Sequence, residues 1–152
     1  MCYTAFMIKI NFNGLKTPYR KTVRSAVEFF MQELLSKRKS DNTELTVRFI
    51  KLPSNIHGFC HIDDEEDNLY SPKTFNIDIS SKLGLDRILE TLAHEMVHMR
   101  QFRNKELCYR ENYTRFRGVA YSLDMPYEKE PWEKEAYKLE KSLVKKFMKE
   151  CM

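Results

Sequence analysis

The stretch TLAHEMVHMRQ, residues 91–101, places two of the chain's four histidines four positions apart, with a glutamate directly after the first. It lies within residues 85–102, where leucine, isoleucine and methionine recur at helical spacing. Asp86 near the start and basic residues near the end suit the dipole of a helix. The sequence therefore predicts a helix here, with its apolar side against a core and with His94 and His98 on an edge that faces a cleft.

The spacing of the two histidines is typical of a zinc site. Residues four positions apart lie on one face of a helix, so His94 and His98 can reach one ion at about 2.0–2.1 Å each. Glu95 lies about 100° further around the helix, where it is poorly directed as a ligand but well placed to touch a water on the metal. The pattern predicts two zinc ligands and a general base. Two unrelated surface histidines are the alternative.

A catalytic zinc site usually has three protein ligands, so a third must come from elsewhere in the chain. Residues 131–150 open with a proline and keep helical periodicity, with Glu133 and Glu135 near their start. These two glutamates lie on opposite shoulders of an apolar stripe made of Trp132, Ala136, Leu139, Leu143 and Phe147. Further apolar residues beside Glu133 favour it slightly as the third ligand. Two solvated glutamates at the positive end of a helix are the alternative.

The remaining hydrophobic pattern predicts short strands and one more helix. The expected strands are 5–12, 45–52, 56–62 and 74–80, the last two forming an antiparallel pair around an acidic turn at 63–68. Residues 18–38 predict an amphipathic helix with a basic outer face, and residues 113–123 a hairpin or an irregular loop. No repeat or linker interrupts this order. The sequence therefore predicts one α+β domain over residues 1–152.

The composition indicates a protein of the cytoplasm. Hydrophobic residues make up 42% and charged residues 32%, and no apolar run approaches the length of about 20 residues that spans a bilayer. The alternating N-terminal segment does not resemble a signal peptide. The four cysteines are scattered, which favours free thiols in a reducing compartment over disulfides. The net charge of +4 permits contact with nucleic acid without requiring it.

Several of these segments together resemble one family. The stretch TLAHEMVHMRQ followed by PWEKEAY, with IHGFCHI and FNIDIS upstream, is similar to the SprT-like zinc metallopeptidases, particularly small phage-encoded members. The similarity covers roughly residues 56–140. It implies a zincin-like fold, in which a small twisted sheet packs against an active-site helix and a C-terminal helix. It also implies a peptide substrate bound by strand addition along an edge strand, for which residues 74–80 are the candidate. If the chain is phage-encoded, it would act in the host-cell cytoplasm.

The chain also departs from the family. SprT-like proteins recruit a third histidine, whereas no histidine follows His98 here. The chain instead resembles the gluzincin arrangement, in which a Glu-x-x-Ala helix supplies a carboxylate. That resemblance assigns the third ligand to Glu133, three positions before Ala136, with Glu135 held in reserve. The zinc-ribbon tail of the family requires paired cysteines, which this sequence lacks.

The resulting prediction is a zinc-dependent endopeptidase. Zinc would activate a water, Glu95 would take its proton, and either Tyr121 or Tyr127 would be a second donor to the oxyanion. The alternative is a nucleic-acid-associated or regulatory binding protein that keeps the fold without efficient turnover. Its support is the basic stretch at residues 16–39 and a lysine-rich C-terminal segment. Solvated helix faces explain those charges as well, so nucleic-acid binding is not expected.

Overall fold

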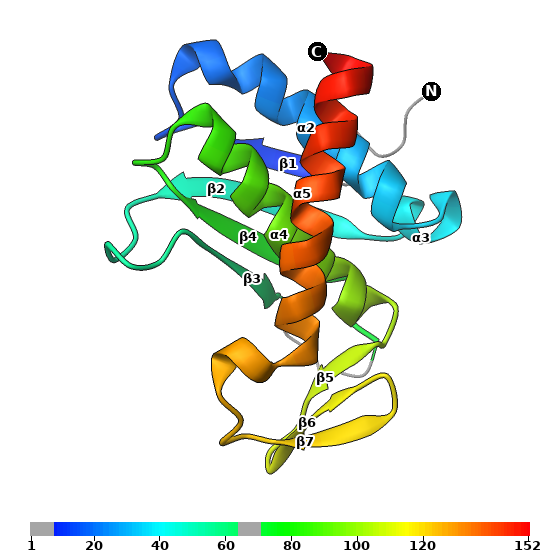
Figure 1. Cartoon of the computed structure of the whole chain (residues 1–152). Coiled ribbons are helices and arrows are strands. Elements are labelled where there is room, and N and C mark those ends of the chain that lie inside the picture. The colour runs from blue at the N-terminus through cyan, green and yellow to red at the C-terminus, as the bar shows by residue number, and fades with distance from the viewer. Residues whose placement is uncertain (1–7, 64–70) are drawn as a thin grey trace.

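The computed structural model describes residues 8–63 and 71–152 of the 152-residue chain, in which groups of strands and helices follow one another (Figure 1). The strands are β1 (Ile8–Asn11), β2 (Glu44–Ile50), β3 (Gly58–Ile62), β4 (Thr74–Ser80), β5 (Leu107–Tyr109), β6 (Tyr113–Phe116) and β7 (Val119–Ser122). The helices are α2 (Arg20–Leu34), α3 (Lys37–Asp41), α4 (Leu85–Arg103) and α5 (Pro131–Cys151), with short 3₁₀ helices at Thr17–Tyr19 and Tyr127–Lys129. The predicted α+β class is confirmed.

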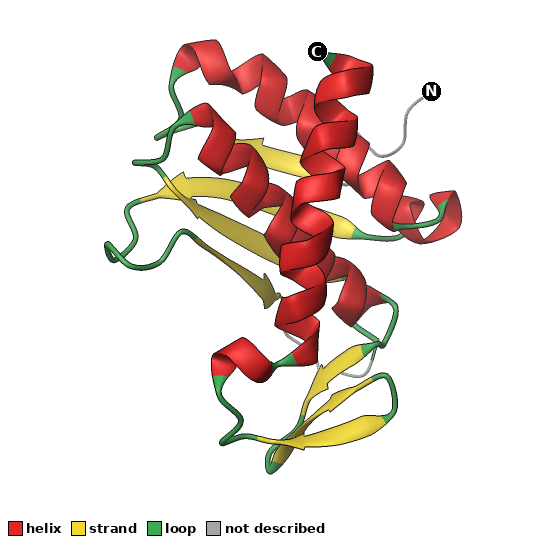
Figure 2. Cartoon of the chain, in the orientation of Figure 1, coloured by secondary structure: helices red, strands yellow, loops and turns green. Residues whose placement is uncertain are grey.

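A four-stranded sheet with the order β1-β2-β4-β3 supports the helices, which lie on one of its faces (Figure 2). Strands β1, β2 and β4 are parallel, while β3 runs antiparallel to β4. The antiparallel pairing expected between residues 56–62 and 74–80 is therefore confirmed. Most of the acidic turn expected at 63–68 lies outside the described residues.

The prediction that residues 74–80 form an edge strand is wrong, because β4 lies between β2 and β3. The strand alternates polar and apolar residues like an edge strand, yet its polar Asp78 is only 4% exposed. Asp78 tolerates this burial because Arg48 and His61 both bond to its carboxylate, at 2.8 and 3.1 Å. The edge strand next to α4 is β3.

Helix α4 is the centre of the core, with the sheet on one side and α5 packed along another. Its expected apolar side is buried, since Ile88, Leu92, Met96 and Met99 are at most 1% exposed. Ala136 of α5 is fully buried and lets the two helices approach closely. The apolar stripe predicted for α5 is confirmed: Trp132, Ala136, Leu143 and Phe147 are buried, and Leu139 packs against them.

One segment differs from its predicted form, and another takes one of the two forms that the sequence predicted. The helix expected over 18–38 is divided, because Leu35 is extended and Ser36 begins α3 by accepting a hydrogen bond from the Lys39 backbone N–H. Residues 113–123 contain the β6–β7 hairpin, turned at Arg117 and Gly118, which both have positive φ angles of 50° and 82°. Strand β5, which the sequence did not indicate, extends this hairpin to a three-stranded sheet.

Within the described ranges, none of the helices has the length and apolar character that crossing a membrane requires.

Candidate metal centre

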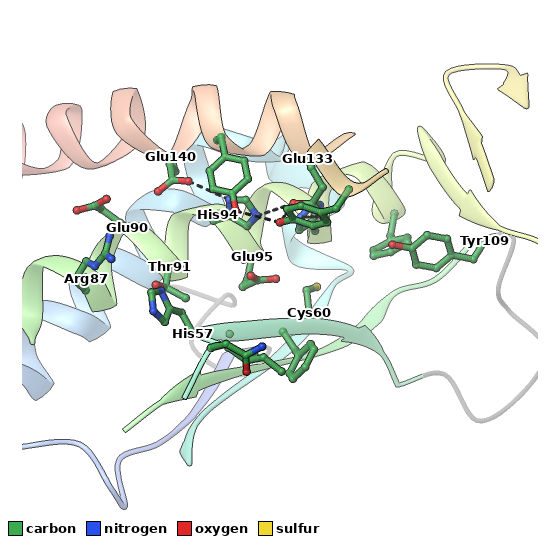
Figure 3. Close-up of a pocket in the computed structure, with 18 residues that line it drawn as sticks. His57, Cys60, Arg87, Glu90, Thr91, His94, Glu95, Tyr109, Glu133 and Glu140 are labelled. Atoms are coloured by element: carbon green, nitrogen blue, oxygen red, sulfur yellow. Dashed lines mark hydrogen bonds and ion pairs between the residues drawn. The ribbon is translucent and has the colours of Figure 1, made fainter. Parts of the chain in front are cut away.

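Helices α4 and α5 bring three potential ligands together (Figure 3). The Nε2 atom of His94 lies 3.0 Å from Oε1 of Glu133, and Nε2 of His98 lies 3.0 Å from Oε2 of the same carboxylate. One possible ligand atom from each of these three residues lies within 4.8 Å of the other two. The i, i+4 spacing on α4 aligns the two imidazoles, and the first turn of α5 presents the carboxylate to both.

The second glutamate at the start of α5, Glu135, lies on another side of the helix. Residues two positions apart are separated by about 200° around a helix, so Glu133 and Glu135 cannot face the same partners. Glu135 forms ion pairs with Arg100 and Arg117 and accepts a hydrogen bond of 2.9 Å from Gln101. The structure therefore brings Glu133 to the histidines and Glu135 to the arginines.

The other nitrogen of each imidazole also has a partner. Nδ1 of His94 lies 3.1 Å from Oε1 of Glu140, and Nδ1 of His98 lies 2.8 Å from Oε1 of Gln101. Sequence reasoning missed both partners, although helical spacing carried a signal for each. Gln101 is three positions after His98, and Glu140 is two turns after Glu133 on the same side of α5. With both Nδ1 atoms held in this way, both Nε2 atoms point to the common centre.

The charge of the cluster suits a cation. Burial lowers the pKa of His94, but hydrogen bonds to Glu133 and Glu140 outweigh it and raise the pKa to about 9. At His98, burial lowers the pKa, but the hydrogen bond to Glu133 outweighs burial and raises it. The two imidazoles in turn hold the pKa of Glu133 below its usual range. Three carboxylates, those of Glu95, Glu133 and Glu140, thus surround two imidazoles in a buried site, an arrangement that positive charge stabilises.

The donor set also matches zinc in kind and spacing. Two imidazole nitrogens and one carboxylate oxygen are ligands of catalytic zinc sites, which keep a fourth position for water or substrate. Ligand atoms about 2.0–2.2 Å from one tetrahedral ion lie about 3.3 Å apart. Each Nε2 atom lies 3.0 Å from a different oxygen of the Glu133 carboxylate, somewhat less than that spacing, and one ligand atom from each of the three residues lies within 4.8 Å of the others. The residues present therefore fit a zinc ion.

Glu95 lies beside this group, between α4 and β3 (Figure 3). Its residue surface is 8% exposed, and burial raises the pKa of its carboxyl group above the usual range. A carboxylate with a raised pKa is a stronger proton acceptor near neutral pH. Glu95 therefore has the environment of a general base, next to donors that fit a metal.

A cavity of about 750 Å³ opens over these side chains. Its walls come from the edge strand and the loop before it, from α4, from β5, from the second 3₁₀ helix and from the first half of α5: Asn55, Ile56, His57, Gly58, Phe59, Cys60, Arg87, Glu90, Thr91, His94, Glu95, His98, Phe102, Tyr109, Tyr127, Glu133, Tyr137 and Glu140. The histidine edge of α4 thus faces a cleft, as expected. Strand β3, rather than residues 74–80, lines it.

Of the two tyrosines expected near the site, the structure places Tyr127 there. Its hydroxyl donates a hydrogen bond of 2.8 Å to Oε1 of Glu133 and lies 3.1 Å from the hydroxyl of Tyr137. Burial and these two neighbours raise the pKa of Tyr127, which keeps the phenol protonated. Tyr121 instead packs its ring against Trp132, with the centroids 5.7 Å apart.

Gly58 lets the edge strand β3 approach α4. A Cβ atom at this position would lie 2.7 Å from Cγ2 of Thr91, 3.0 Å from the carbonyl oxygen of Asp78 and 3.3 Å from Cγ of Glu95. We expect Gly58→Ala to push β3 away from α4 and to lower the free energy of unfolding by about 1–3 kcal/mol. Urea denaturation measures this change.

Gly84→Ala is the control for Gly58→Ala, because a Cβ at Gly84 meets no atom within 4 Å. Gly84 is the N-cap of α4, so its replacement should cost less than about 1 kcal/mol. Equal denaturation midpoints for the two variants would contradict the prediction, because they would show that β3 can move away from α4 without a loss in the free energy of unfolding.

Comparison with known protein families, with curated proteins and with solved structures found no match. The resemblance to SprT-like metallopeptidases stays a prediction. The chemistry of the cavity is therefore argued from its own side chains.

Proposed function

We propose that this protein is a zinc-dependent endopeptidase with a zincin-like fold. His94, His98 and Glu133 would hold the zinc, and Glu95 would be the general base. The observation that carries the proposal is the convergence of both Nε2 atoms on the Glu133 carboxylate, in the wall of a cavity that Glu95 also lines. Helices on one face of a sheet, with an antiparallel edge strand beside the cleft, support the zincin-like assignment.

The side chains around the cavity suit peptide hydrolysis. Zinc, when bound, would supply a Lewis acid and make a water molecule more acidic. The Glu95 carboxylate would accept a proton from that water and later deliver it to the nitrogen of the leaving amine. The Tyr127 hydroxyl would donate a hydrogen bond to the oxygen of the attacked carbonyl, which gains negative charge.

The substrate in this proposal is an extended peptide. Strand β3 is last in the order of its sheet, so in the described part of the chain one of its edges pairs with β4 and the other is available for strand addition. Gly58 and Cys60 of this strand line the cavity opposite α4. Hydrogen bonds from β3 to the peptide backbone would place a peptide bond close to Glu95 without requiring a particular side chain.

The alternative, a binding protein without turnover, accounts less well for the position of Glu95. A site that only holds metal needs the three ligands and the residues that orient them. A further carboxyl group that is neither a ligand nor a partner of one, buried in the cavity at a cost in desolvation, adds nothing to such a site. For a peptidase the same group is required.

Removal of metal should abolish the activity. We expect zinc-loaded protein to cleave unfolded casein, and the cleavage to stop when a chelator removes the ion and to return after one equivalent of zinc is added. The His94→Ala/His98→Ala variant, prepared in the same way, should stay inactive throughout. Cleavage that persists at full rate in the metal-free protein would contradict the proposed function.

A further inference from the structure

Gln101 contacts the candidate metal centre through His98 and lies at a junction between α4 and α5. It is fully buried, and its Oε1 atom lies 2.8 Å from Nδ1 of His98. Its Nε2 atom donates two hydrogen bonds, one of 3.0 Å to the carbonyl oxygen of Trp132 and one of 2.9 Å to Oε1 of Glu135. All three contacts connect the active-site helix with the first turn of α5 or with a histidine of the centre.

These contacts determine the orientation of the amide. A carbonyl oxygen and a carboxylate oxygen only accept hydrogen bonds, so the NH₂ group of Gln101 must face Trp132 and Glu135. The amide oxygen then faces His98, and because that oxygen only accepts, Nδ1 of His98 must carry the hydrogen. In the neutral imidazole this leaves the lone pair on Nε2, the atom that faces Glu133.

Glu135 holds the amide of Gln101 from the other side. Its carboxylate is itself fixed by Arg100 of α4 and by Arg117 at the β6–β7 turn, and Arg117 also pairs with Glu106 at 2.8 Å. The carboxylate of Glu135 can therefore hardly rotate away from Gln101. A path of hydrogen bonds and ion pairs leads from the small sheet to the histidine.

We propose that Gln101 is a positioning residue that fixes the ring orientation and the tautomer of His98, and that Glu135 acts on the metal centre through Gln101. The inference rests on the metal centre of the proposed function. It gives Glu135 a role other than that of a ligand. Partners of ligating histidines typically change metal affinity by about 10–100-fold when they are removed.

The first test compares two substitutions at one position in the full chain. Gln101→Met keeps the length of the side chain but removes the acceptor, and we expect zinc affinity to fall by about 10–100-fold in competition with a chromophoric chelator. Gln101→Glu keeps an acceptor facing His98 but loses the donor that faces Trp132 and Glu135, so its affinity should fall by less than that of Gln101→Met, by no more than about 10-fold. The Nδ1–H proton of His98 in the zinc-loaded protein is the second readout: by NMR its exchange with water should be slow in wild type and Gln101→Glu, and fast in Gln101→Met.

The second test asks whether Glu135 acts through Gln101. Glu135→Ala should weaken zinc binding by a few-fold, and the double variant Gln101→Met/Glu135→Ala should bind no more weakly than Gln101→Met alone. Glu128→Ala is the control, because it removes an exposed glutamate of the adjoining 3₁₀ helix and should leave the affinity unchanged.

The outcomes separate the inference from the function on which it rests. If wild-type protein binds no zinc, the proposed function fails. If wild type binds zinc and Gln101→Met and Gln101→Glu bind it equally well or equally poorly, the hydrogen bond to His98 has no such role and the inference is overturned. If the effects of Gln101→Met and Glu135→Ala multiply in the double variant, Glu135 does not act through Gln101.

Discussion

Glu95→Gln is expected to bind zinc as tightly as the wild-type protein and to lose peptidase activity by about 10²–10⁴-fold, the range that general acid–base catalysis contributes. The substitution keeps the shape of the side chain and all three proposed ligands. It removes the carboxylate that accepts the proton, and an amide cannot take over that step. The measurement is the initial rate of casein cleavage by zinc-loaded protein, together with its zinc content.

Glu90→Gln is the matched control for this prediction. Glu90 lies on the same helix and lines the same cavity, but it is not part of the group formed by His94, His98 and Glu133. Its replacement by glutamine should change the cleavage rate by no more than a few-fold. Equal cleavage rates for Glu95→Gln and the wild-type protein would exclude Glu95 as the base.

Glu133→Ala is expected to have the largest effect on metal binding of any substitution in α5. It leaves two imidazoles to hold the ion, so zinc affinity should fall by more than the roughly 10–100-fold that a partner of a ligand contributes. Glu135→Ala changes the same residue type two positions further along, where the carboxylate faces Arg100, Arg117 and Gln101. Competition with a chelator should therefore give Glu133→Ala a far lower zinc affinity than Glu135→Ala. The reverse order would assign the third ligand to Glu135.

The sequence predicted the part of the site that one helix carries. The i, i+4 spacing of His94 and His98 specifies their common face whatever surrounds them, because the periodicity of a helix is fixed. The choice between Glu133 and Glu135 was harder, since both lie beside the apolar stripe of α5. It depends on the rotation of α5 against α4, which the packing of Ala136 and its neighbours determines in three dimensions.

The edge strand was mispredicted for a similar reason. Asn76 and Asp78 give residues 74–80 the alternation of a half-exposed strand. The buried Asp78 bonds to Arg48 and His61, which are 30 and 17 positions away. A local sequence pattern does not predict pairs that are so far apart along the chain. Gln101 and Glu140 were missed because helical spacing alone does not show that their side chains contact His98 and His94. The break at Ser36 carried a local signal, since serine is a favoured N-cap.

The central claim is that His94, His98 and Glu133 together hold one zinc ion. X-ray diffraction from crystals of the zinc-loaded protein, recorded on both sides of the zinc absorption edge, tests it most directly. We predict one anomalous peak per chain, about 2.0–2.2 Å from Nε2 of His94, Nε2 of His98 and a carboxylate oxygen of Glu133. A peak at another place, or a structure in which the carboxylates of Glu133 and Glu135 both point to solvent, would contradict the metal centre and with it the proposed peptidase.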